Sequence, residues 1–264
     1  MNPFTFHKAG SIDAATKNFA DAAEGKYLAG GQTLIPVLKQ RLAAPSDLIS
    51  LAAIDDLAGV TATADKITIG AMTRHAAVAS SQEVRRAIPA LAELAGGIGD
   101  PHVRNRGTLG GSVANNDPAA DYPAAVLGLG ATVVTNKRRV AADDFFQGLF
   151  TTALEDGEII TAIEFPVPER AGYVKFPHPA SRYCLVGVMV AKMAGGIRVA
   201  VTGAGESGVF RATAFEQALA KNFAADAIAT VKLPEDGMMS DIHAGAAYRA
   251  HLVGVLTRRA VAKA

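Results

Sequence analysis

Two glycine-rich segments contain the residue types that could bind an anionic ligand. The first is Ala29–Leu34, with the sequence AGGQTL, and the second is Arg106–Asp121, with the sequence RGTLGGSVANNDPAAD. Glycine lets the backbone approach a phosphate closely and permits positive φ, while neighbouring hydroxyls add hydrogen bonds. Because the two segments lie about 75 residues apart, they suggest one large dinucleotide held between two lobes.

The first segment is expected to join a short strand to a helix. Gly30 and Gly31 leave the backbone N–H groups open to a diphosphate, and Thr33 adds a hydroxyl at the start of the helix. A tight strand-to-helix turn would explain the glycine pair equally well. The segment is neither a Walker motif, because no lysine follows the glycines, nor a G-x-G-x-x-G fingerprint.

The second segment places hydroxyls on both sides of a glycine pair and ends in two carboxylates. Asp117 is expected to be the N-cap of a helix that Pro118 opens. Asp121 would then lie in the first turn, either as a solvated partner of the helix dipole or directed back toward a ligand. A general acid or base role for Asp121 has little support, because nothing in the sequence supplies a partner.

Each of the remaining candidate residues could have a structural role instead of binding a ligand. Arg104 and Arg106 could pair with phosphate, fix the long loop through carboxylates, or face a partner subunit. Lys175 is expected to face solvent, and Cys184 is expected to be a half-buried small side chain. The six histidines show no metal-ligand spacing, so we expect no metal site, and His102 is assigned a structural role. No residue is predicted to be a catalyst.

Composition excludes several functional classes. The 264 residues are 50% hydrophobic, and the formal net charge is +1, so there is no basic footprint for nucleic acid. A single cysteine cannot form an intramolecular disulfide or hold an iron–sulfur cluster alone, and it favours a cytoplasmic setting. We expect neither a transmembrane helix nor a signal peptide.

Hydrophobic periodicity and turn residues divide the chain into three units. The first, residues 1–56, is expected to contain helices over 11–22 and 33–43 and strands over 26–29 and 48–51. The second, residues 57–167, is expected to contain strands over 60–63, 66–70, 131–135 and 159–165, three short helices within 74–95, an irregular segment over 96–118 and a helix over 119–127. The third, residues 168–264, is expected to contain strands over 173–176, 185–193 and 197–202 and helices over 215–220 and 241–262, the last capped by Ser240 or Asp241.

The motifs together resemble the flavin-binding medium subunit of molybdenum hydroxylases, the family of carbon monoxide dehydrogenase and xanthine dehydrogenase. The matching text is LAGGQTLIP from Leu28, IGAMTRH from Ile69, VRNRGTLGGSVA from Val103, and DPAAD from Asp117. The segment Tyr173–Lys175 leading into Val186–Val188, and the final helix, are also similar. The resemblance covers essentially the whole chain.

This resemblance implies an α+β fold, in which a two-lobed FAD-binding domain of the vanillyl-alcohol oxidase type precedes a C-terminal antiparallel sheet with helices. It implies FAD as cofactor, a [2Fe–2S] small subunit and a molybdopterin large subunit as partners in a dimer of heterotrimers, and electron transfer through FAD to an external acceptor. Such a complex would be cytoplasmic or held at a membrane through its other parts. The implied FAD contacts are Leu28, Ala29, Gly30, Gly31, Gln32, Thr33, Leu34, Ile98, Thr108, Leu109, Gly110, Gly111, Ser112, Asn115, Asp121, Ile160 and Lys175.

Some features depart from the family pattern. Gln32-Thr33 replaces the commoner His or Thr-Asp text, and the segment Pro177–Cys184 replaces the usual Arg-Ala-x-x-Asp-Phe type of text. Tyr183, in that segment, could shield one face of the flavin. Two other readings remain open: a stand-alone FAD-dependent oxidase or dehydrogenase, and a scaffold with degenerate FAD loops.

Overall fold

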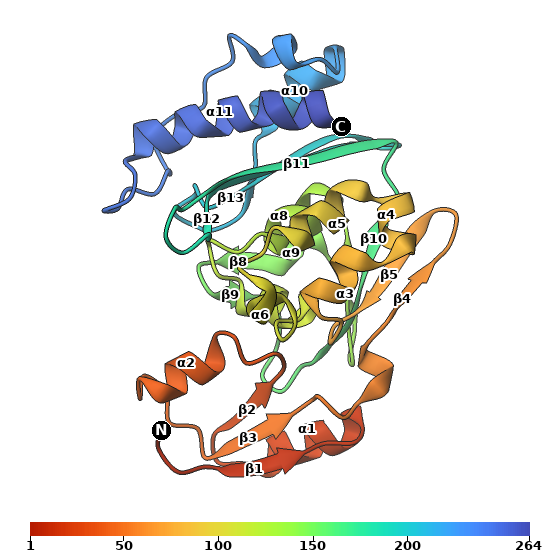
Figure 1. Ribbon diagram of the computed structural model, residues 1–264, viewed down its shortest axis with the longest axis vertical. Helices are drawn as coiled ribbons and strands as arrows, with labels where there is room; N and C mark the ends of the chain where they lie inside the picture. The colour runs from red at the N-terminus through yellow and green to blue at the C-terminus, as the bar shows by residue number, and fades with distance from the viewer.

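The first unit of the chain is a small parallel sheet with two helices, at the bottom of Figure 1. The structure is a computed structural model that describes all 264 residues. The sheet has the strand order β1-β3-β2, and both pairings are parallel. Ser11 caps the first helix, because its hydroxyl accepts a hydrogen bond from the N–H of Ala14. The elements are β1 (Thr5–Lys8), α1 (Ile12–Asp21), β2 (Gly25–Leu28), α2 (Leu34–Lys39) and β3 (Asp47–Ser50).

The second unit is a five-stranded antiparallel sheet covered by short helices. Its strand order is β4-β5-β10-β6-β7, and its sheet and helices share the largest hydrophobic core, a cluster of 31 buried residues. The elements are η1 (Asp55–Leu57), β4 (Val60–Ala62), β5 (Lys66–Gly70), α3 (His75–Ser80), α4 (Gln82–Ala87), α5 (Pro89–Gly96), α6 (Pro101–Arg104), α7 (Leu109–Asn115), α8 (Tyr122–Gly128), β6 (Thr132–Thr135), β7 (Arg139–Ala141), α9 (Ala142–Phe145), β8 (Phe146–Gly148), β9 (Thr151–Thr152) and β10 (Ile160–Pro166).

The third unit is an antiparallel sheet packed between the second unit and the C-terminal helices (Figure 1). Its central strand is buried on both faces: Val188 and Val190 face the core beneath the final helix, whereas Met189 and Ala191 belong to the core of the second unit. No helix is both long and apolar enough to cross a membrane. The elements are β11 (Arg170–Pro177), β12 (Cys184–Met193), β13 (Gly196–Thr202), β14 (Phe210–Arg211), α10 (Thr213–Lys221), η2 (Ala225–Ile228) and α11 (Ala246–Lys263).

The long segment 96–118 is not irregular, contrary to expectation, because it contains α6 and α7. Asp100 caps α6 by accepting from the N–H of Val103, and Thr108 caps α7 by accepting from the N–H of Gly111. Glycine has a low helix propensity, but packing and side-chain caps outweigh it here.

Three other helix boundaries also differ from the sequence prediction. The helix expected over 119–127 begins at Tyr122, and the helix expected over 33–43 ends at Lys39, shortly before Arg41 adopts a φ of 59°. The final helix begins at Ala246 rather than Asp241. The Asp241 carboxylate instead accepts hydrogen bonds from the N–H groups of His243 and Ala244. It therefore stabilises a turn that precedes the helix.

Candidate functional site

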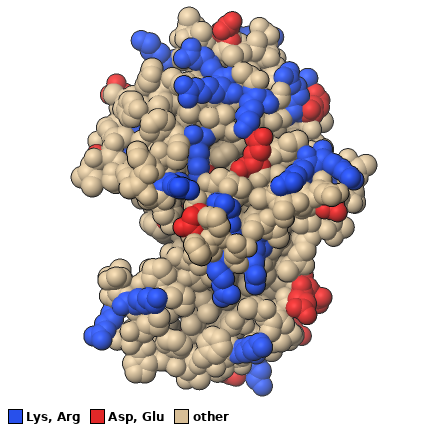
Figure 2. All heavy atoms as spheres, in the orientation of Figure 1, with Lys and Arg blue, Asp and Glu red and all other residues tan.

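The two glycine-rich segments meet where the first unit joins the second. A Cβ added to Gly30 would lie 2.3 Å from the carbonyl oxygen of Arg106 and 2.7 Å from the Cα of Gly107. A Cβ added to Gly111 would lie 3.4 Å from the Cβ of Ala29. We call this junction of Ala29–Leu34 with Arg106–Asp121 the waist. Figure 2 shows the surface hollowed there, with basic side chains around the hollow. Glycine is therefore required at Gly30 because two stretches of backbone approach each other there.

The first segment offers a row of free donors. The backbone N–H groups of the residues from Gly30 to Leu34 make no hydrogen bond within the protein. Gly31 adopts a φ of 73°, a conformation that turns successive N–H groups toward one side. Thr33 occupies the N-cap position of α2, but its hydroxyl makes no capping bond, so the expected cap is absent and the hydroxyl is free to meet a ligand.

The second segment differs, because its backbone donors are already used. The N–H groups of Leu109 and Gly110 donate to the carbonyl oxygens of Thr73, at 3.0 Å, and of Ala71, at 2.8 Å. The N–H of Gly111 donates to the Thr108 hydroxyl at 3.2 Å. A Cβ on Gly110 would lie 2.5 Å from the Cβ of Ala71, so this glycine allows α7 to pack closely. The second segment thus offers space for a ligand, because its glycines lack side chains, but no free backbone N–H groups at Leu109, Gly110 or Gly111.

Two polar side chains of α7 remain available beside that room. The hydroxyl of Ser112 and the amide of Asn115 make no hydrogen bond within the protein, and both residues are partly exposed. Thr108 and Leu109, by contrast, are 3% and 0% exposed. Any ligand on this side of the waist would therefore meet Gly111, Ser112 and Asn115 before it met the residues beneath them.

Asp121 and Lys175 form a buried ion pair at the end of the second segment. The Lys175 Nζ lies 2.9 Å from Oδ1 and 3.2 Å from Oδ2 of Asp121, and it also donates to the carbonyl oxygen of Gly97 at 2.8 Å. The side chains are 12% and 6% exposed, so the expectation that Lys175 faces solvent was wrong. Burial raises the pKa of Asp121, although Lys175 and a hydrogen bond from Tyr173 act in the opposite direction.

The structure also corrects the roles expected for neighbouring residues. Asp117 does not cap a helix; its carboxylate accepts from the N–H of Ala119 at 2.8 Å and stabilises a turn. Arg104 fixes the loop by donating to the carbonyl oxygen of Ile98 at 3.0 Å, not to a carboxylate. Cys184 is 3% exposed rather than half-buried, and burial raises the pKa of its thiol well above the ordinary range.

Several predicted positions form the surroundings of the waist rather than its surface. Ile160 is 5% exposed within the core of the second unit, and Ile98 packs against that core. Leu28 ends β2 immediately before the first glycine-rich segment. Gln32 is exposed. The structure therefore brings both loops together and places Ile160 behind them.

Three further residues support this site, and sequence reasoning anticipated only the unusual backbone angle of the first, Asn116. Asn116 adopts a left-handed conformation, with a φ of 44°, and donates to the carbonyl oxygens of Gly148 and Thr151. His75 packs against Gly107, where a Cβ would meet its Nε2 at 2.5 Å. Burial and then the charge of Arg104 lower the pKa of His75 to about 4, so the ring is neutral. The pair of adjacent asparagines indicated the unusual backbone at Asn116, whereas nothing in the local sequence indicated the role of His75.

The third supporting residue is Tyr173, whose hydroxyl donates to Oδ1 of Asp121 at 2.6 Å. Tyr173 and Lys175 lie two residues apart on β11, so their side chains lie on the same face of the sheet. This period-two spacing is a signal that sequence analysis could have used.

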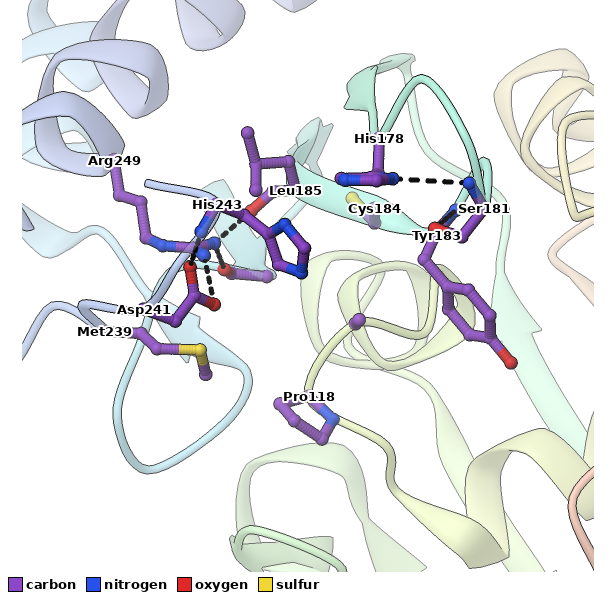
Figure 3. Close-up of a pocket in the computed structure, with 12 residues that line it drawn as sticks. Pro118, His178, Ser181, Tyr183, Cys184, Leu185, Met239, Asp241, His243 and Arg249 are labelled. Atoms are coloured by element: carbon purple, nitrogen blue, oxygen red, sulfur yellow. Dashed lines mark hydrogen bonds and ion pairs between the residues drawn. The ribbon is translucent and has the colours of Figure 1, made fainter. Parts of the chain in front are cut away.

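A cavity of about 190 Å³ opens on the other side of the turn after Asn116. Figure 3 shows Pro118 at its edge and the rings of His178 and His243 next to each other, edge to face, among the residues that line it. The two ring centroids are 4.5 Å apart. Tyr183 lines the cavity and is 55% exposed. The cavity shares none of the glycines of the waist, although Pro118 and Ala119 at the end of the second glycine-rich segment line it.

The fold has two lobes that meet at the waist and a C-terminal antiparallel sheet with helices, and comparison with known proteins identifies its class as an FAD-binding domain. Residues 2–168 match the family described as the FAD binding domain in molybdopterin dehydrogenase. The chain belongs to this family. It is the FAD-binding medium subunit of a molybdenum hydroxylase-type dehydrogenase, and thus part of an oxidoreductase.

Several relatives align along nearly their whole length. The carbon monoxide dehydrogenase medium chain of Afipia carboxidovorans is 34% identical, with 99% of this chain and 96% of the relative covered. The glyceraldehyde dehydrogenase medium chain of Sulfolobus acidocaldarius is also 34% identical, with 97% and 96% covered. The structure of carbon monoxide dehydrogenase from Hydrogenophaga pseudoflava, in a form that lacks the Mo-pyranopterin moiety, matches with a TM-score of 0.88 and 33% identity over 100% of this chain and 98% of that chain.

Proposed function

We propose that FAD binds at the waist with its diphosphate against the first glycine-rich segment. The single observation that carries this assignment is the run of unused backbone N–H groups from Gly30 to Leu34. Unpaired backbone donors are costly unless water or a ligand satisfies them, and a diphosphate has the acceptor oxygens to do so. The glycine contact at Gly30 holds this row of donors against the second unit.

The other residues assigned to FAD would then have distinct tasks. Gly111 has no side chain, so it leaves space for the cofactor on the face of α7 near Ala29. Ser112 and Asn115 on the same helix offer hydrogen bonds. Lys175, anchored by Asp121, would add an ammonium group that donates a hydrogen bond to the cofactor. Leu28, Ala29, Gln32, Ile98, Thr108, Leu109, Gly110 and Ile160 would shape the walls that surround the cofactor.

We further propose that this subunit passes electrons from the [2Fe–2S] clusters of a small subunit to an external acceptor, while a large molybdopterin subunit transforms the substrate. FAD supplies the redox chemistry, and the protein holds it and sets its surroundings. This division of labour is supported by the single cysteine of the chain and by the relatives, which are medium chains of dehydrogenases. Those relatives carry different substrate names at the same identity, which supports the proposal that another subunit determines the substrate.

Titration of the flavin-free protein with FAD tests the binding assignment. We expect saturable uptake with visible flavin absorption, and loss of that uptake in Gly111→Val, because a branched side chain would crowd the Thr108 hydroxyl, 2.8 Å from the new Cβ, and fill the space beside Ala29. Co-expression with the two partner subunits should then yield a complex in which substrate reduces the flavin. Normal flavin occupancy in Gly111→Val would remove the waist as the site.

A further inference from the structure

We propose that Tyr173 is a positioning residue for the cofactor: its hydroxyl fixes Asp121 so that Lys175 is held at one place beside FAD. This inference rests on the proposed function. It adds a residue that does not itself face the waist, because Tyr173 is 6% exposed and reaches the site only through the carboxylate.

The three side chains form a short chain of contacts that leads outward. The Tyr173 hydroxyl donates to Oδ1 of Asp121 at 2.6 Å. The same carboxylate holds the Lys175 Nζ, which also donates to the carbonyl oxygen of Gly97 at 2.8 Å and, more weakly, to that of Arg182 at 3.4 Å. An ammonium group has three protons. The proton in the longest contact is therefore the one most available to an acceptor on a ligand.

The surrounding sheet is shaped to hold the Tyr173 hydroxyl in place. Gly187 is paired with Lys175 across the sheet, and a Cβ on Gly187 would lie 2.6 Å from both the Tyr173 hydroxyl oxygen and the Cys184 Sγ. The Cys184 Sγ itself lies 3.9 Å from that hydroxyl. With the thiol on one side and the carboxylate on the other, the hydroxyl has one strong acceptor, Asp121.

The charges at this position make the hydroxyl important to the ion pair. Burial raises the pKa of Asp121, and the two groups that oppose this rise are Lys175 and the Tyr173 hydroxyl. The other titratable groups packed near the carboxylate are Tyr122 on α8 and Cys184 on β12, whose own pKa values are raised by burial and by Asp121. Without the Tyr173 hydroxyl the carboxylate protonates at higher pH, and a neutral Asp121 no longer anchors Lys175.

The test compares the pH dependence of FAD binding in the full-length wild-type protein and in Tyr173→Phe, by FAD titration of flavin-free protein. We expect Tyr173→Phe to bind FAD about tenfold more weakly at neutral pH, because a hydrogen bond to a charged group is lost. We also expect the loss of affinity on acidification to occur about one pH unit higher than in the wild type. A merely structural role would lower affinity equally at every pH.

Two further variants keep the result interpretable. Tyr122→Phe is the matched control, because the Tyr122 hydroxyl is buried without a hydrogen-bond partner, and it should bind FAD like the wild type. Gly187→Ala keeps the Tyr173 side chain, but the added methyl group pushes its hydroxyl away from Asp121. It should therefore reproduce the shifted pH profile.

The possible failures are distinguishable. If the wild type does not bind FAD, the proposed function fails. If the wild type binds FAD, Asp121→Asn weakens it, and both Tyr173→Phe and Gly187→Ala keep the wild-type affinity and pH profile, then only the role of Tyr173 is refuted.

Discussion

The contact at Gly30 predicts a sharp penalty for adding a single methyl group. In Gly30→Ala the new Cβ would lie 2.3 Å from a carbonyl oxygen of the second unit, whereas ordinary contact begins near 3.4 Å. The two glycine-rich segments must therefore separate by about 1 Å. Overpacking of this kind costs about 1–3 kcal/mol. If the donors of the first segment move away from α7 by that distance, FAD affinity should fall about 10- to 100-fold.

The assay is FAD titration of flavin-free protein by fluorescence quenching, with the unfolding midpoint measured in parallel. Gly10→Ala is the matched control, because Gly10 lies in the same unit and a Cβ there meets no atom within 4 Å. The control should retain wild-type affinity and stability. An affinity of Gly30→Ala within twofold of the wild type would show that close approach of the two segments is not needed for binding, and the reasoning from backbone contact would be wrong.

Three further predictions concern the carboxylates and the cap of α7. Although burial raises the pKa of Glu158, hydrogen bonds led by that from Arg138 hold it at about 2, below the ordinary 4.5; the resulting stabilisation, about 3 kcal/mol, is present above pH 4.5 and lost as the pH falls toward 2. Urea unfolding should show this acid loss in the wild type and a flatter profile in Glu158→Gln. Asp121→Ala should weaken FAD binding more than Asp117→Ala in a titration, and the reverse order would mean that the two carboxylates are wrongly assigned. Thr108→Val should lower the free energy of unfolding by about 1 kcal/mol, since it removes the capping hydroxyl of α7; an unchanged value would argue against the cap.

Sequence reasoning singled out the two glycine-rich segments that the fold brings together, but it misjudged how the backbone donors of the second segment are used. Gly30 and Gly111 were identified from local composition, which is the information that a turn or a close approach leaves in a sequence. The use of backbone donors was not visible there, because the acceptors for Leu109 and Gly110 lie on Thr73 and Ala71, far upstream in the chain. Only folding brings these groups together.

The same reason explains the error at Lys175. A single lysine on a strand usually faces solvent, and its partner Asp121 lies 54 residues earlier in the chain. Helix limits were missed where side-chain caps and packing overrode propensity, as at Thr108. The resemblance to known medium subunits supplied Lys175 as a contact, whereas its isolated position on a strand did not.

The unequal size of the hydrophobic cores has a consequence for how the apoprotein behaves. The unit that carries the free donors packs around a cluster of only seven buried residues, two of which, Leu57 and Ile159, belong to the second unit, whereas the largest core has 31. Small cores are marginal by themselves, so the first unit depends on its contacts with the second, which include Ile159 in the shared cluster and the hydrogen bond from the Tyr27 hydroxyl to the carbonyl oxygen of Gly157. A dinucleotide that spans the waist would bind both units and stabilise their contact. Folding of the N-terminal unit and binding of the cofactor would then be coupled during assembly.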